Sequence, residues 1–408
     1  MRVLVLDTIH GGSEIGAAFA EAGHAVDMVD VYRGSTPEAA ERAAHEQYDL
    51  VAAPVHLDPD HPLLVFHKKN TLVITHHEAV HRLLGDRIPR PMIEITGAQG
   101  KTTTAHALSS ILPGPGVLHT STGTYELPGG RVFFKKSITP ALVLAAVEKA
   151  RETGGWLVAE ESLGVTGAGD LAIVTSPDDY RCAAGKKSAL AEKLASVQES
   201  RQVLLAPGIF GKIPEHVVRL EDVTEFSGTT CTIRLAGRSG SFFNPLLSLP
   251  GYRVPLALAG AAALMLGYDP APLSGFPGVP GRMSTRREGP VTIVDNANSG
   301  TTAGTTTEAA RYARACTGIP GLTLVIGTVS GDGAVCEGFP IDTIAEAVRE
   351  IRPDRLVLVG DYSGEKEILL SSFPTHIDAV CATLAEAERA ARAITSSGAI
   401  VLAVKTWR

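Results

Sequence analysis

A glycine-rich turn between an apolar run and a run of threonines constrains this chain more than any other feature. Residues 92–104 read MIEITGAQGKTTT, so an expected strand ends at Gly97 and an expected helix starts at Lys101. Glycines at such a turn let backbone N–H groups point inward around an anion, and the helix N-terminus adds its positive end. This strand–loop–helix order is the context that a phosphate-binding loop requires.

The side chains that follow the turn supply the charges that ATP and its metal ion need. Lys101 provides a point charge for the outer phosphates, and Thr102 or Thr103 offers a hydroxyl to Mg²⁺. The residues expected to contact the nucleotide here are Gly97, Ala98, Gln99, Gly100, Lys101, Thr102 and Thr103. Gly97 lies only three residues before Gly100, which differs from the usual GxxxxGK[ST] spacing. The alternative interpretation is a tight strand–helix turn with an incidental lysine.

Apolar runs alternate with helix-like stretches along the chain. The runs expected as strands are residues 3–7, 49–54, 71–76, 92–97, 156–162, 171–176, 291–297, 322–327, 355–360 and 399–404. Stretches 38–46, 141–152 and 341–351 carry apolar residues at helical spacing. This alternation predicts an α/β fold with parallel sheets covered on both faces. The first run is short and soon turns polar, so it indicates a buried strand and not a signal peptide.

Length and charge narrow the classes of protein that fit. We expect three blocks, residues 1–88, 89–281 and 282–408, with a hinge in the Pro- and Gly-rich segment 272–281. The net charge of −7 argues against a nucleic-acid partner or an anionic membrane. No run approaches the about 18 apolar residues of a membrane span. Five scattered cysteines without a CxxC pair favour a reducing cytoplasm over a disulfide or zinc framework.

The loop TGAQGKTTT resembles the TG-x-x-GKT[ST] loop of the Mur ligase superfamily, which includes the peptidoglycan amino-acid ligases and folylpolyglutamate synthetase. The resemblance implies a substrate-binding domain, a central P-loop ATPase domain and a C-terminal Rossmann-like domain, in the order of the three blocks. It also implies activation of a carboxylate by ATP to an acyl phosphate, which a nucleophile then attacks.

Two further segments resemble motifs of the central domain. Residues 158–162 (VAEES) are similar to the E-x-S segment whose glutamate binds Mg²⁺, with Glu160 as the expected ligand and Glu161 as the fallback. The alternative for this pair is a solvated strand end. Lys186 and Lys187 follow a segment where many members carry a lysine that becomes carbamylated and helps to hold a second Mg²⁺. The alternative for these lysines is a basic helix start that faces solvent.

Motifs near the third block resemble the family's hinge and nucleotide contacts. Residues 278–283 (GVPGRM) are a close match to the hinge whose arginine, Arg282, reaches the nucleotide phosphates. Residues 294–299 (VDNANS) resemble V-D-x-A-H-N-P, so Asp295 and Asn298 are expected at the nucleotide, although an Asp at a strand end is often a helix cap. The resemblance thus implies three catalytic residues, Lys101, Glu160 and Arg282.

Other features most resemble the Mur-ligase-like enzymes of methanogenic archaea that complete the nickel tetrapyrrole coenzyme F430. The third block shows no obvious pocket motif for a free amino acid, and residues 327–339 replace the family's usual segments. This resemblance implies that ATP activates a propionate side chain of a seco-tetrapyrrole and that a ring carbon attacks it, closing a carbocycle by a C–C bond. Nickel arrives inside the substrate, so no protein nickel site is expected.

The first block would then hold this small-molecule substrate. Its segment DTIHGG follows the first strand, at the sheet edge where ligands usually bind. The candidate substrate contacts are Thr8, His10, Arg33 and His76, followed by His56, His77 and the Lys135–Lys136 pair. The alternative for Arg33 and for the two lysines is solvated surface charge. The group His76, His77 and His81 could share one face of a helix and bind a metal ion. The alternative for this group is a polar helix start at the surface.

Two other functions stay open. One is a Mur-type amide ligase that adds an amino acid to a cell-wall or cofactor precursor. The other is a P-loop ATP-binding regulator that performs no ligation, which the hinge arginine (Arg282) and the strand-end Glu160 disfavour. Mg²⁺ accompanies ATP in either ligase, and the sequence does not indicate an oligomeric state.

Overall fold

The alternating apolar and amphipathic runs fold into three main sheets with helices on their faces, so the predicted α/β class is confirmed. The computed structural model describes residues 1–34, 36–213, 216–298, 300–318, 321–329, 339–361, 373 and 375–406. Most of the segment 327–339 therefore lies outside the described residues. The chain divides into two units, Met1–Phe276 and Pro277–Arg408, and the boundary falls within the segment 272–281.

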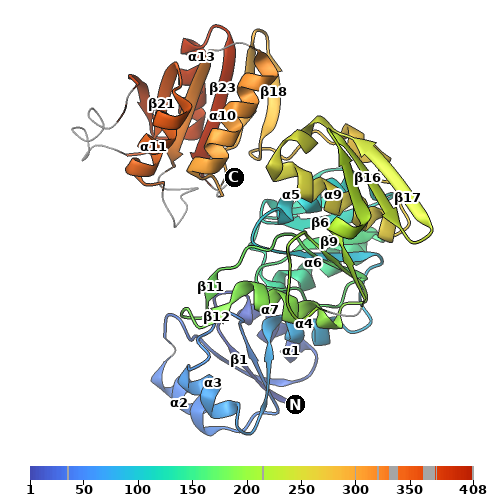
Figure 1. Cartoon of the computed structure of the whole chain (residues 1–408). Helices are drawn as coiled ribbons and strands as arrows, with labels where there is room; N and C mark the ends of the chain where they lie inside the picture. Colours follow the sequence, from blue (N-terminus) through green and yellow to red (C-terminus); the bar gives the residue numbers. More distant parts are fainter. Residues whose placement is uncertain are drawn as a thin grey trace. The chain divides into compact units, whose positions relative to one another are not determined.

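The first sheet has four parallel strands in the order β2-β1-β3-β4. Its elements are β1 (Arg2–Leu6), α1 (Gly12–Glu21), β2 (Ala25–Val29), α2 (Pro37–His45), β3 (Leu50–Ala53), α3 (Pro62–His67), β4 (Leu72–Thr75) and α4 (His76–Leu84). Helices α1 and α4 cover one face, and α2 and α3 cover the other (Figure 1). Strand β2 was not predicted, because its partly exposed residues include Asp27 and do not form an apolar run. Since the strands are parallel, the turns after β1, β3 and β4 meet at one edge.

The second sheet carries the phosphate loop (residues 97–104). Its order is β14-β13-β10-β5-β9-β6-β7-β8, in which β7 alone runs opposite to the other strands. The strands are β5 (Met92–Thr96), β6 (Gly116–Thr120), β7 (Gly123–Leu127), β8 (Arg131–Phe134), β9 (Trp156–Glu160), β10 (Leu171–Val174), β13 (Val203–Leu205) and β14 (Val217–Arg219). Strand β5 lies between β10 and β9, so the turns after these two strands flank the loop.

Helices cover both faces of the second sheet (Figure 1). They are α5 (Lys101–Ser109), α6 (Pro140–Thr153), α7 (Ala189–Ser196), α8 (Leu220–Val223) and α9 (Pro250–Met265). Helix α6 packs on the face turned toward the first sheet, and one apolar core joins Val3 of β1, residues of α1, α4 and α6, and Val117 of β6. A Cβ atom on Gly11 would lie 2.6 Å from Ala141 Cβ, so the turn before α1 sits directly against α6. The two sheets therefore share a helical layer.

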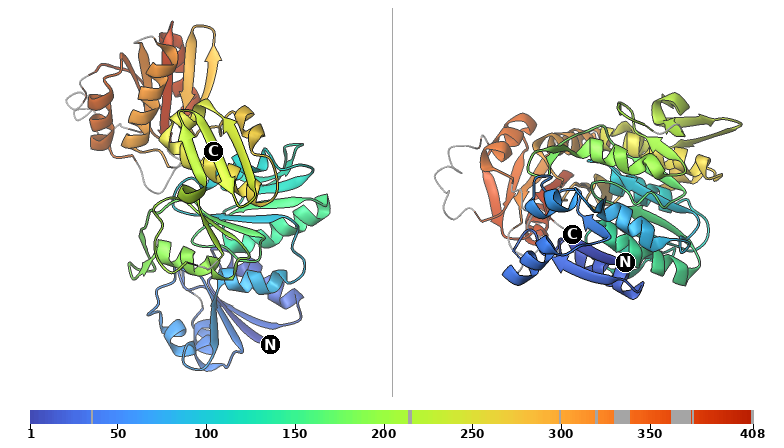
Figure 2. Two further views of the ribbon diagram at one scale, coloured as in Figure 1. Left: turned by 45° about the vertical axis from the view of Figure 1, so that its right-hand side comes forward. Right: turned by 90° about the horizontal axis from the view of Figure 1, so that it is seen from below.

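Smaller elements complete the first unit. They are the hairpin β11 (Arg181–Cys182) with β12 (Lys187–Ser188), the antiparallel sheet β15 (Thr224–Ser227), β16 (Thr230–Leu235) and β17 (Arg238–Phe243), and the 3-10 turns η1 (Val197–Glu199), η2 (Pro245–Ser248) and η3 (Ala271–Gly275). The three-stranded sheet is yellow-green in Figure 2. It packs on α9 at Gly260, where a Cβ atom would lie 2.7 Å from the Ile233 side chain.

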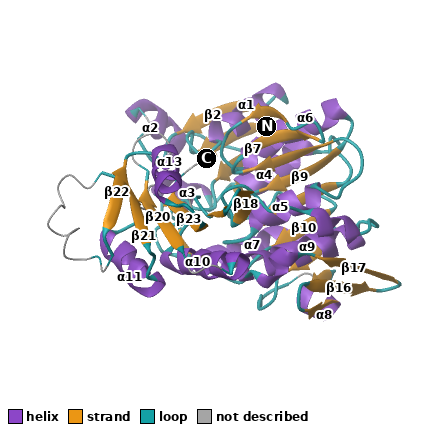
Figure 3. Cartoon of the chain, turned by 90° about the horizontal axis from the view of Figure 1, so that it is seen from above, coloured by secondary structure: helices purple, strands orange, loops and turns teal. Residues whose placement is uncertain are grey.

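The second unit is a six-stranded sheet in the order β18-β19-β23-β20-β21-β22, parallel except for β18. Its elements are β18 (Ser284–Glu288), β19 (Val291–Asp295), α10 (Ala303–Thr317), β20 (Leu322–Thr328), α11 (Ile341–Ile351), β21 (Arg355–Val359), β22 (Ile377–Cys381), α13 (Leu384–Ile394) and β23 (Gly398–Lys405). Helix α13 lies on one face, and α10 and α11 lie on the other (Figure 3). Among the described residues, none of the helices combines the length and apolar character that crossing a membrane requires.

Candidate functional site

The phosphate loop adopts a turn that only glycine accepts at two positions. Gly97 has φ +146° and Gly100 has φ +82°. A Cβ atom on Gly97 would lie 2.2 Å from Thr175 Oγ1 and one on Gly100 would lie 3.2 Å from Pro255 Cγ. Side chains rarely adopt such φ values, and at Gly97 a side chain would also collide with Thr175. The loop therefore keeps its backbone amides at the N-terminus of α5, where an anion is favoured.

Residues after β10 hold the loop from one side. Ser176 Oγ accepts hydrogen bonds from the backbone N–H groups of Ala98 and Gln99, each at 3.2 Å. The Thr175 hydroxyl donates to the carbonyls of Thr96 and Gln99. The sequence analysis gave these two residues no role. Their hydroxyls are the signal that could have indicated a supporting function.

The end of β9 supplies an acidic group on the other side. Thr102 Oγ1 donates to Glu160 Oε2 at 2.9 Å, and Lys101 Nζ lies 3.9 Å from Glu160 Oε1. Lys101 Nζ also donates to the Gly97 carbonyl at 3.0 Å. The Ser121 backbone N–H donates to Glu160 Oε2, the oxygen that also accepts from Thr102, at 3.1 Å. Thus three of the residues predicted to act on ATP and Mg²⁺ form one buried polar group, joined by Ser121, which was not predicted.

Glu161, the fallback metal ligand, lies in a different environment. It is fully buried, and burial together with the neighbouring Glu94 raises the pKa of its carboxyl well above the ordinary value. Glu94 itself accepts hydrogen bonds from the N–H groups of Thr166, Gly167 and Gly169. A carboxyl that keeps its proton is a poor Mg²⁺ ligand, so the geometry favours Glu160.

Lys193 of α7 is a buried lysine that the sequence reasoning did not single out. Its Nζ has no hydrogen-bond partner in the described part of the chain, and it lies 4.6 Å from the centre of the Tyr180 ring. Desolvation, and then the charge of Lys101, lower its pKa to about 8. By contrast, Lys186 pairs with Asp58 and Asp60 at the surface, each at 2.6 Å. The position of Lys193 at the fifth residue of the helix that follows the Lys186–Lys187 pair is the signal that was missed.

A cavity of about 230 Å³ opens beside the phosphate loop. Its walls are Gln99, Gly100, Thr175, Ser176, Pro177, Asp178, Ala206, Pro207, Pro250, Gly251, Val254 and Pro255. The apolar prolines and glycines of these segments form a surface next to the loop amides. The cavity can take part of a nucleotide whose phosphates lie on the loop.

The first sheet gathers aromatic and acidic groups at its carboxyl edge. Asp7, directly after β1, is fully buried with φ +94°, and its carboxylate accepts hydrogen bonds from the backbone of Ile9 and His10. His10 Nδ1 lies 3.1 Å from Asp7 Oδ2. The rings of His10 and His56 meet edge to face at 4.7 Å, and Tyr32 stacks on His56 at 5.4 Å. This edge is the place where the sequence predicted the substrate.

His76 and His77 begin α4 and are buried, so the alternative of a polar helix start at the surface is wrong. Burial lowers the pKa of His76 to about 3 and that of His77 to about 4, which keeps both rings neutral at pH 7. His77 Nε2 lies 3.0 Å from the Ser162 carbonyl, whereas His81 Nδ1 lies 3.0 Å from the Thr166 carbonyl. The donor atoms of His76, His77 and His81 do not converge as predicted for a metal site. Among the described residues, the donor atoms that converge are those of Asp7, His10 and His56.

The remaining substrate candidates lie around this edge. Arg33 is exposed in the turn after β2, and its backbone N–H donates to Asp30 Oδ1 at 2.9 Å. The Thr8 hydroxyl interacts with the same Asp30 carboxylate. Lys136 is exposed and lies 3.9 Å from Glu14, away from the histidines. The edge thus brings together Thr8, His10 and His76, with Arg33 in the neighbouring turn.

Three predicted nucleotide contacts lie in the second unit. Arg282 sits in a tight turn, and its N–H donates to the Val279 carbonyl at 2.9 Å. The Asn298 side chain donates to the Gly281 carbonyl at 2.7 Å, so it ties the loop after β19 to that turn. Asp295 ends β19, where its carboxylate accepts the Ala297 N–H at 3.1 Å. These contacts order the turn that presents Arg282.

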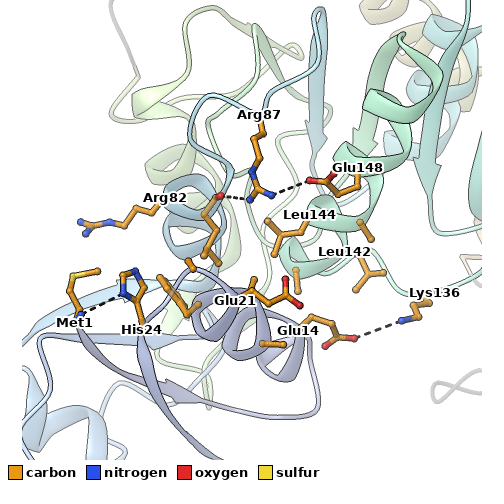
Figure 4. Close-up of a pocket in the computed structure, with 17 residues that line it drawn as sticks. Met1, Glu14, Glu21, His24, Arg82, Arg87, Lys136, Leu142, Leu144 and Glu148 are labelled. Atoms are coloured by element: carbon orange, nitrogen blue, oxygen red, sulfur yellow. Dashed lines mark hydrogen bonds and ion pairs between the residues drawn. The ribbon is translucent and has the colours of Figure 1, made fainter.

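A larger cavity, about 950 Å³, lies between α1, α4 and α6 (Figure 4). Leu142 and Leu144 of α6 line it, and two ion pairs border it, Arg87 with Glu148 at 3.1 Å and Lys136 with Glu14. None of its lining residues belongs to the phosphate loop or to the end of β9. It is therefore a groove in the shared helical layer and is separate from the group around Glu160.

Sequence comparison identifies relatives along most of the chain. Residues 285–406 match the family described as "Coenzyme F430 synthetase CfbE, C-terminal domain". The coenzyme F(430) synthetase of Methanosarcina acetivorans is 31% identical over an alignment of length 430 that covers 88% of this chain and 90% of that protein.

Solved structures of Mur ligases share the fold. The UDP-N-acetylmuramate-alanine ligase of Thermotoga maritima superimposes with a TM-score of 0.52 at 15% identity, covering 99% of this chain and 95% of that chain. The UDP-N-acetylmuramoylalanyl-D-glutamyl-2,6-diaminopimelate–D-alanyl-D-alanyl ligase of Acinetobacter baumannii gives a TM-score of 0.54 at 15% identity, covering 90% and 89%. The predicted Mur ligase architecture is thereby confirmed, while the exact boundaries of three domains remain a proposal.

Proposed function

The chain belongs to the coenzyme F430 synthetase family and has the Mur ligase fold, which support an ATP-dependent ligase, and on that premise we propose that it activates a carboxylate as an acyl phosphate with ATP and Mg²⁺. In this chemistry a carboxylate oxygen bonds to the γ-phosphorus of ATP while the bond to ADP breaks. A nucleophile then displaces phosphate from the acyl carbon. The observation that carries the proposal is the buried group of Lys101, Thr102 and Glu160 at the phosphate loop.

The protein's part in this reaction is to position the phosphates and neutralise their charge. The amides at the start of α5 and the ammonium of Lys101 act on the phosphates of ATP. Thr102 and Glu160 offer a hydroxyl and a carboxylate that are 2.9 Å apart, which are the hard oxygen donors that Mg²⁺ prefers, so this pair fits the ion. Bound there, Mg²⁺ supplies charge neutralisation on the phosphate oxygens.

For the acceptor we propose a propionate side chain of a nickel seco-tetrapyrrole, an assignment supported by the family's name. A ring carbon gives up a proton, and its electron pair forms a C–C bond to the acyl carbon while phosphate leaves. The cyclised product therefore has one water less than the substrate, and ATP becomes ADP and phosphate. Thr8 and Arg33 remain proposed substrate contacts, and the scattered cysteines favour a cytoplasmic location.

The proposed site has a candidate for the carbamylated lysine of Mur ligases, and it is Lys193 in place of Lys186 or Lys187. A lysine with a pKa near 8 is partly a neutral amine at pH 7, and this amine can add to CO₂, releasing a proton and leaving a carbamate. Mass spectrometry of the intact protein at pH 8 with bicarbonate should show a gain of one CO₂ that Lys193→Met removes. If the gain persists in Lys193→Met, another amine carries it.

Arg282 remains a proposed catalytic residue, and Asp295 and Asn298 remain proposed nucleotide contacts. The support is the match of residues 278–283 to the family hinge. Arg282→Ala should lower kcat for ADP formation by about 100-fold or more, as removal of a charge that stabilises the transition state does. Arg311→Ala is the matched control, because Arg311 is exposed in the same unit and pairs with Glu350 at the surface.

One incubation tests the function. The protein is mixed with ATP, Mg²⁺ and the nickel seco-tetrapyrrole, and the product mass and ADP are measured. Loss of one water without an added amine supports cyclisation. A product that has gained an amino-acid residue instead identifies an amide ligase, and absence of ADP with every acceptor identifies an ATP-binding protein that does not ligate.

A pair of lysine variants links the activity to the phosphate loop. Lys101→Ala should abolish ADP formation while the thermal unfolding curve stays that of a folded protein. Lys149→Ala is the control, because Lys149 lies on α6 and pairs with Glu152 at the surface. Turnover that survives in Lys101→Ala contradicts the role given to the loop.

A further inference from the structure

Four imidazole rings surround one cavity at the carboxyl edge of the first sheet. The cavity measures about 290 Å³ and is lined by His10, Pro54, Val55, His56, His76, His77, Thr139, Pro140, Ser162 and Leu163. The histidines come from the turns after β1, β3 and β4, whose parallel course brings them together. We call this group, with Asp7, the histidine pocket. It is distinct from the group around Glu160, which belongs to the second sheet.

Three of the rings have one nitrogen engaged by a fixed oxygen or backbone group. His10 Nδ1 meets the Asp7 carboxylate at 3.1 Å, and His77 Nε2 meets the Ser162 carbonyl at 3.0 Å. His76 forms a hydrogen bond with the backbone of Leu6. A ring held in this way donates its N–H to the oxygen and directs the lone pair of its other nitrogen away from it. Histidines that bind metals are oriented by the same kind of outer contact.

The nitrogens on the opposite sides of two rings are buried without a partner. His76 Nε2 and His77 Nδ1 have no hydrogen bond within the described part of the chain, although both residues are more than nine-tenths buried and line the cavity. The Thr139 hydroxyl is a third such group. Buried polar atoms without partners cost free energy, so an occupant of the cavity that accepts their lone pairs would be favoured.

The donor atoms of Asp7, His10 and His56 are close enough to share one ion. One ligand atom from each of the three lies within 4.8 Å of the others, and the rings of His10 and His56 are 4.7 Å apart. Two imidazoles and a carboxylate suit Fe²⁺, Co²⁺, Ni²⁺ and Zn²⁺, whereas Mg²⁺ and Ca²⁺ prefer oxygen donors alone. His76 Nε2 is a further nitrogen in the same cavity.

The size of the cavity limits what it can enclose. It measures about 290 Å³, at the lower end of the about 300–1,000 Å³ of pockets for drug-sized ligands, whereas a tetrapyrrole is at the upper end of that class of molecule. The cavity is therefore too small to enclose a whole macrocycle, but it has room for a metal ion with several waters.

We propose that the histidine pocket binds one divalent transition-metal ion through His10, His56 and Asp7, with His76 as an additional nitrogen donor. The ion would join the turns after β1, β3 and β4, and through the neighbouring His77 it would fix these turns against Ser162, two residues beyond Glu160. The site is independent of the ATP site and of the nickel that the proposed substrate carries.

Cobalt is the probe, because its visible absorption reports the ligands. Metal-free protein should bind one Co²⁺ per chain and develop d–d absorption bands, and Mg²⁺ in excess should not displace it. X-ray absorption at the cobalt edge of the unaltered protein should show the outer scattering of imidazole rings. A spectrum of oxygen ligands alone overturns the proposal, and this measurement needs no variant to fold.

Variants assign the ion to the pocket. His10→Gln, His56→Gln and Asp7→Asn each remove a proposed ligand, so each should weaken Co²⁺ binding by more than the about 10- to 100-fold that loss of an outer contact costs. His45→Gln is the matched control, because His45 is an exposed histidine of the first sheet's α2 and should leave binding unchanged. Unchanged Co²⁺ binding in the folded pocket variants, or no Co²⁺ binding by the unaltered protein, overturns the proposal.

Discussion

Replacing Lys193 with methionine should stabilise the first unit at pH 7. The Lys193 ammonium is buried without a hydrogen-bond partner in the described part of the chain, and desolvation together with Lys101 lowers its pKa from 10.5 to about 8. One unit of pKa corresponds to about 1.4 kcal/mol, so the charged form costs the folded state roughly 3 kcal/mol. Methionine fills a similar volume without a charge. We therefore expect the free energy of unfolding to rise by about 2–3 kcal/mol, which is roughly 5–10 °C in Tm.

The stability difference between the unaltered protein and Lys193→Met should change with pH in a defined direction. Between about pH 8 and 10.5 the folded protein has released the Lys193 proton while the unfolded chain still binds it. The unfolded state then binds more protons, so the stability of the unaltered protein rises with pH across this window. Lys193→Met lacks this rise. Its advantage is therefore largest below pH 8 and disappears near pH 10.5.

Urea unfolding followed by the fluorescence of the buried Trp156 measures the effect. The buffers are free of CO₂, because a carbamate would replace the ammonium and abolish the difference. Lys149→Met at the surface is the control and should change stability by less than about 0.5 kcal/mol. The reasoning is refuted if Lys193→Met is less stable than the unaltered protein at pH 7, or if the difference is the same at pH 7 and pH 10.

Three further changes probe the phosphate loop and its neighbours. Glu160→Gln should raise the Mg²⁺ concentration required for half-maximal ADP formation by about 10- to 100-fold, because it replaces the carboxylate beside Thr102 with a neutral amide. An unchanged Mg²⁺ requirement contradicts this role of Glu160. Above pH 4.5 the Glu161 carboxyl keeps its proton in the folded state and loses it in the unfolded chain, so the unaltered protein should lose up to about 1.4 kcal/mol of stability per pH unit. Urea unfolding of Glu161→Gln should lack this dependence on pH. If Glu161→Gln keeps it, another group is responsible. Gly97→Ala should lower the free energy of unfolding by about 1–3 kcal/mol, because Gly97 has φ +146° and a Cβ atom there would lie 2.2 Å from Thr175 Oγ1. It should also abolish nucleotide binding in calorimetry. Intact binding and stability would show that the loop tolerates a side chain.

Local patterns were enough to predict the phosphate loop and the strands that flank it. Residues 92–104 contain their own signal, because the strand, the glycines and the helix start are contiguous in sequence. The same holds for most of the buried parallel strands, which are short apolar runs, although the buried strands β6 and β13 were not predicted. Strand β2 and the antiparallel strands β7 and β8 were missed because they are partly exposed and mix polar with apolar residues.

The supporting residues of the site could not be predicted in the same way. Lys193 lies in an ordinary amphipathic helix, and only its packing against Tyr180 and its proximity to Lys101 distinguish it from a surface lysine. The histidine pocket likewise depends on sheet topology, since His10 and His56 are far apart in the chain and meet only because their strands are neighbours. Sequence spacing instead favoured His81, which turns away to a carbonyl.

The helical layer that the first two sheets share has a consequence for protein engineering. Its core includes Val3 of the first sheet and Val117 of the second, and the turn at Gly11 packs against Ala141. A fragment cut after residue 88 would expose the apolar faces of α1 and α4, and the remainder would expose α6. Exchange of the first sheet alone between relatives would therefore separate two parts of one core. The sheet edge with the histidines and the loop with Lys101 cannot be exchanged independently of each other. A chimaera will keep both only if its crossover lies beyond this layer, toward Phe276.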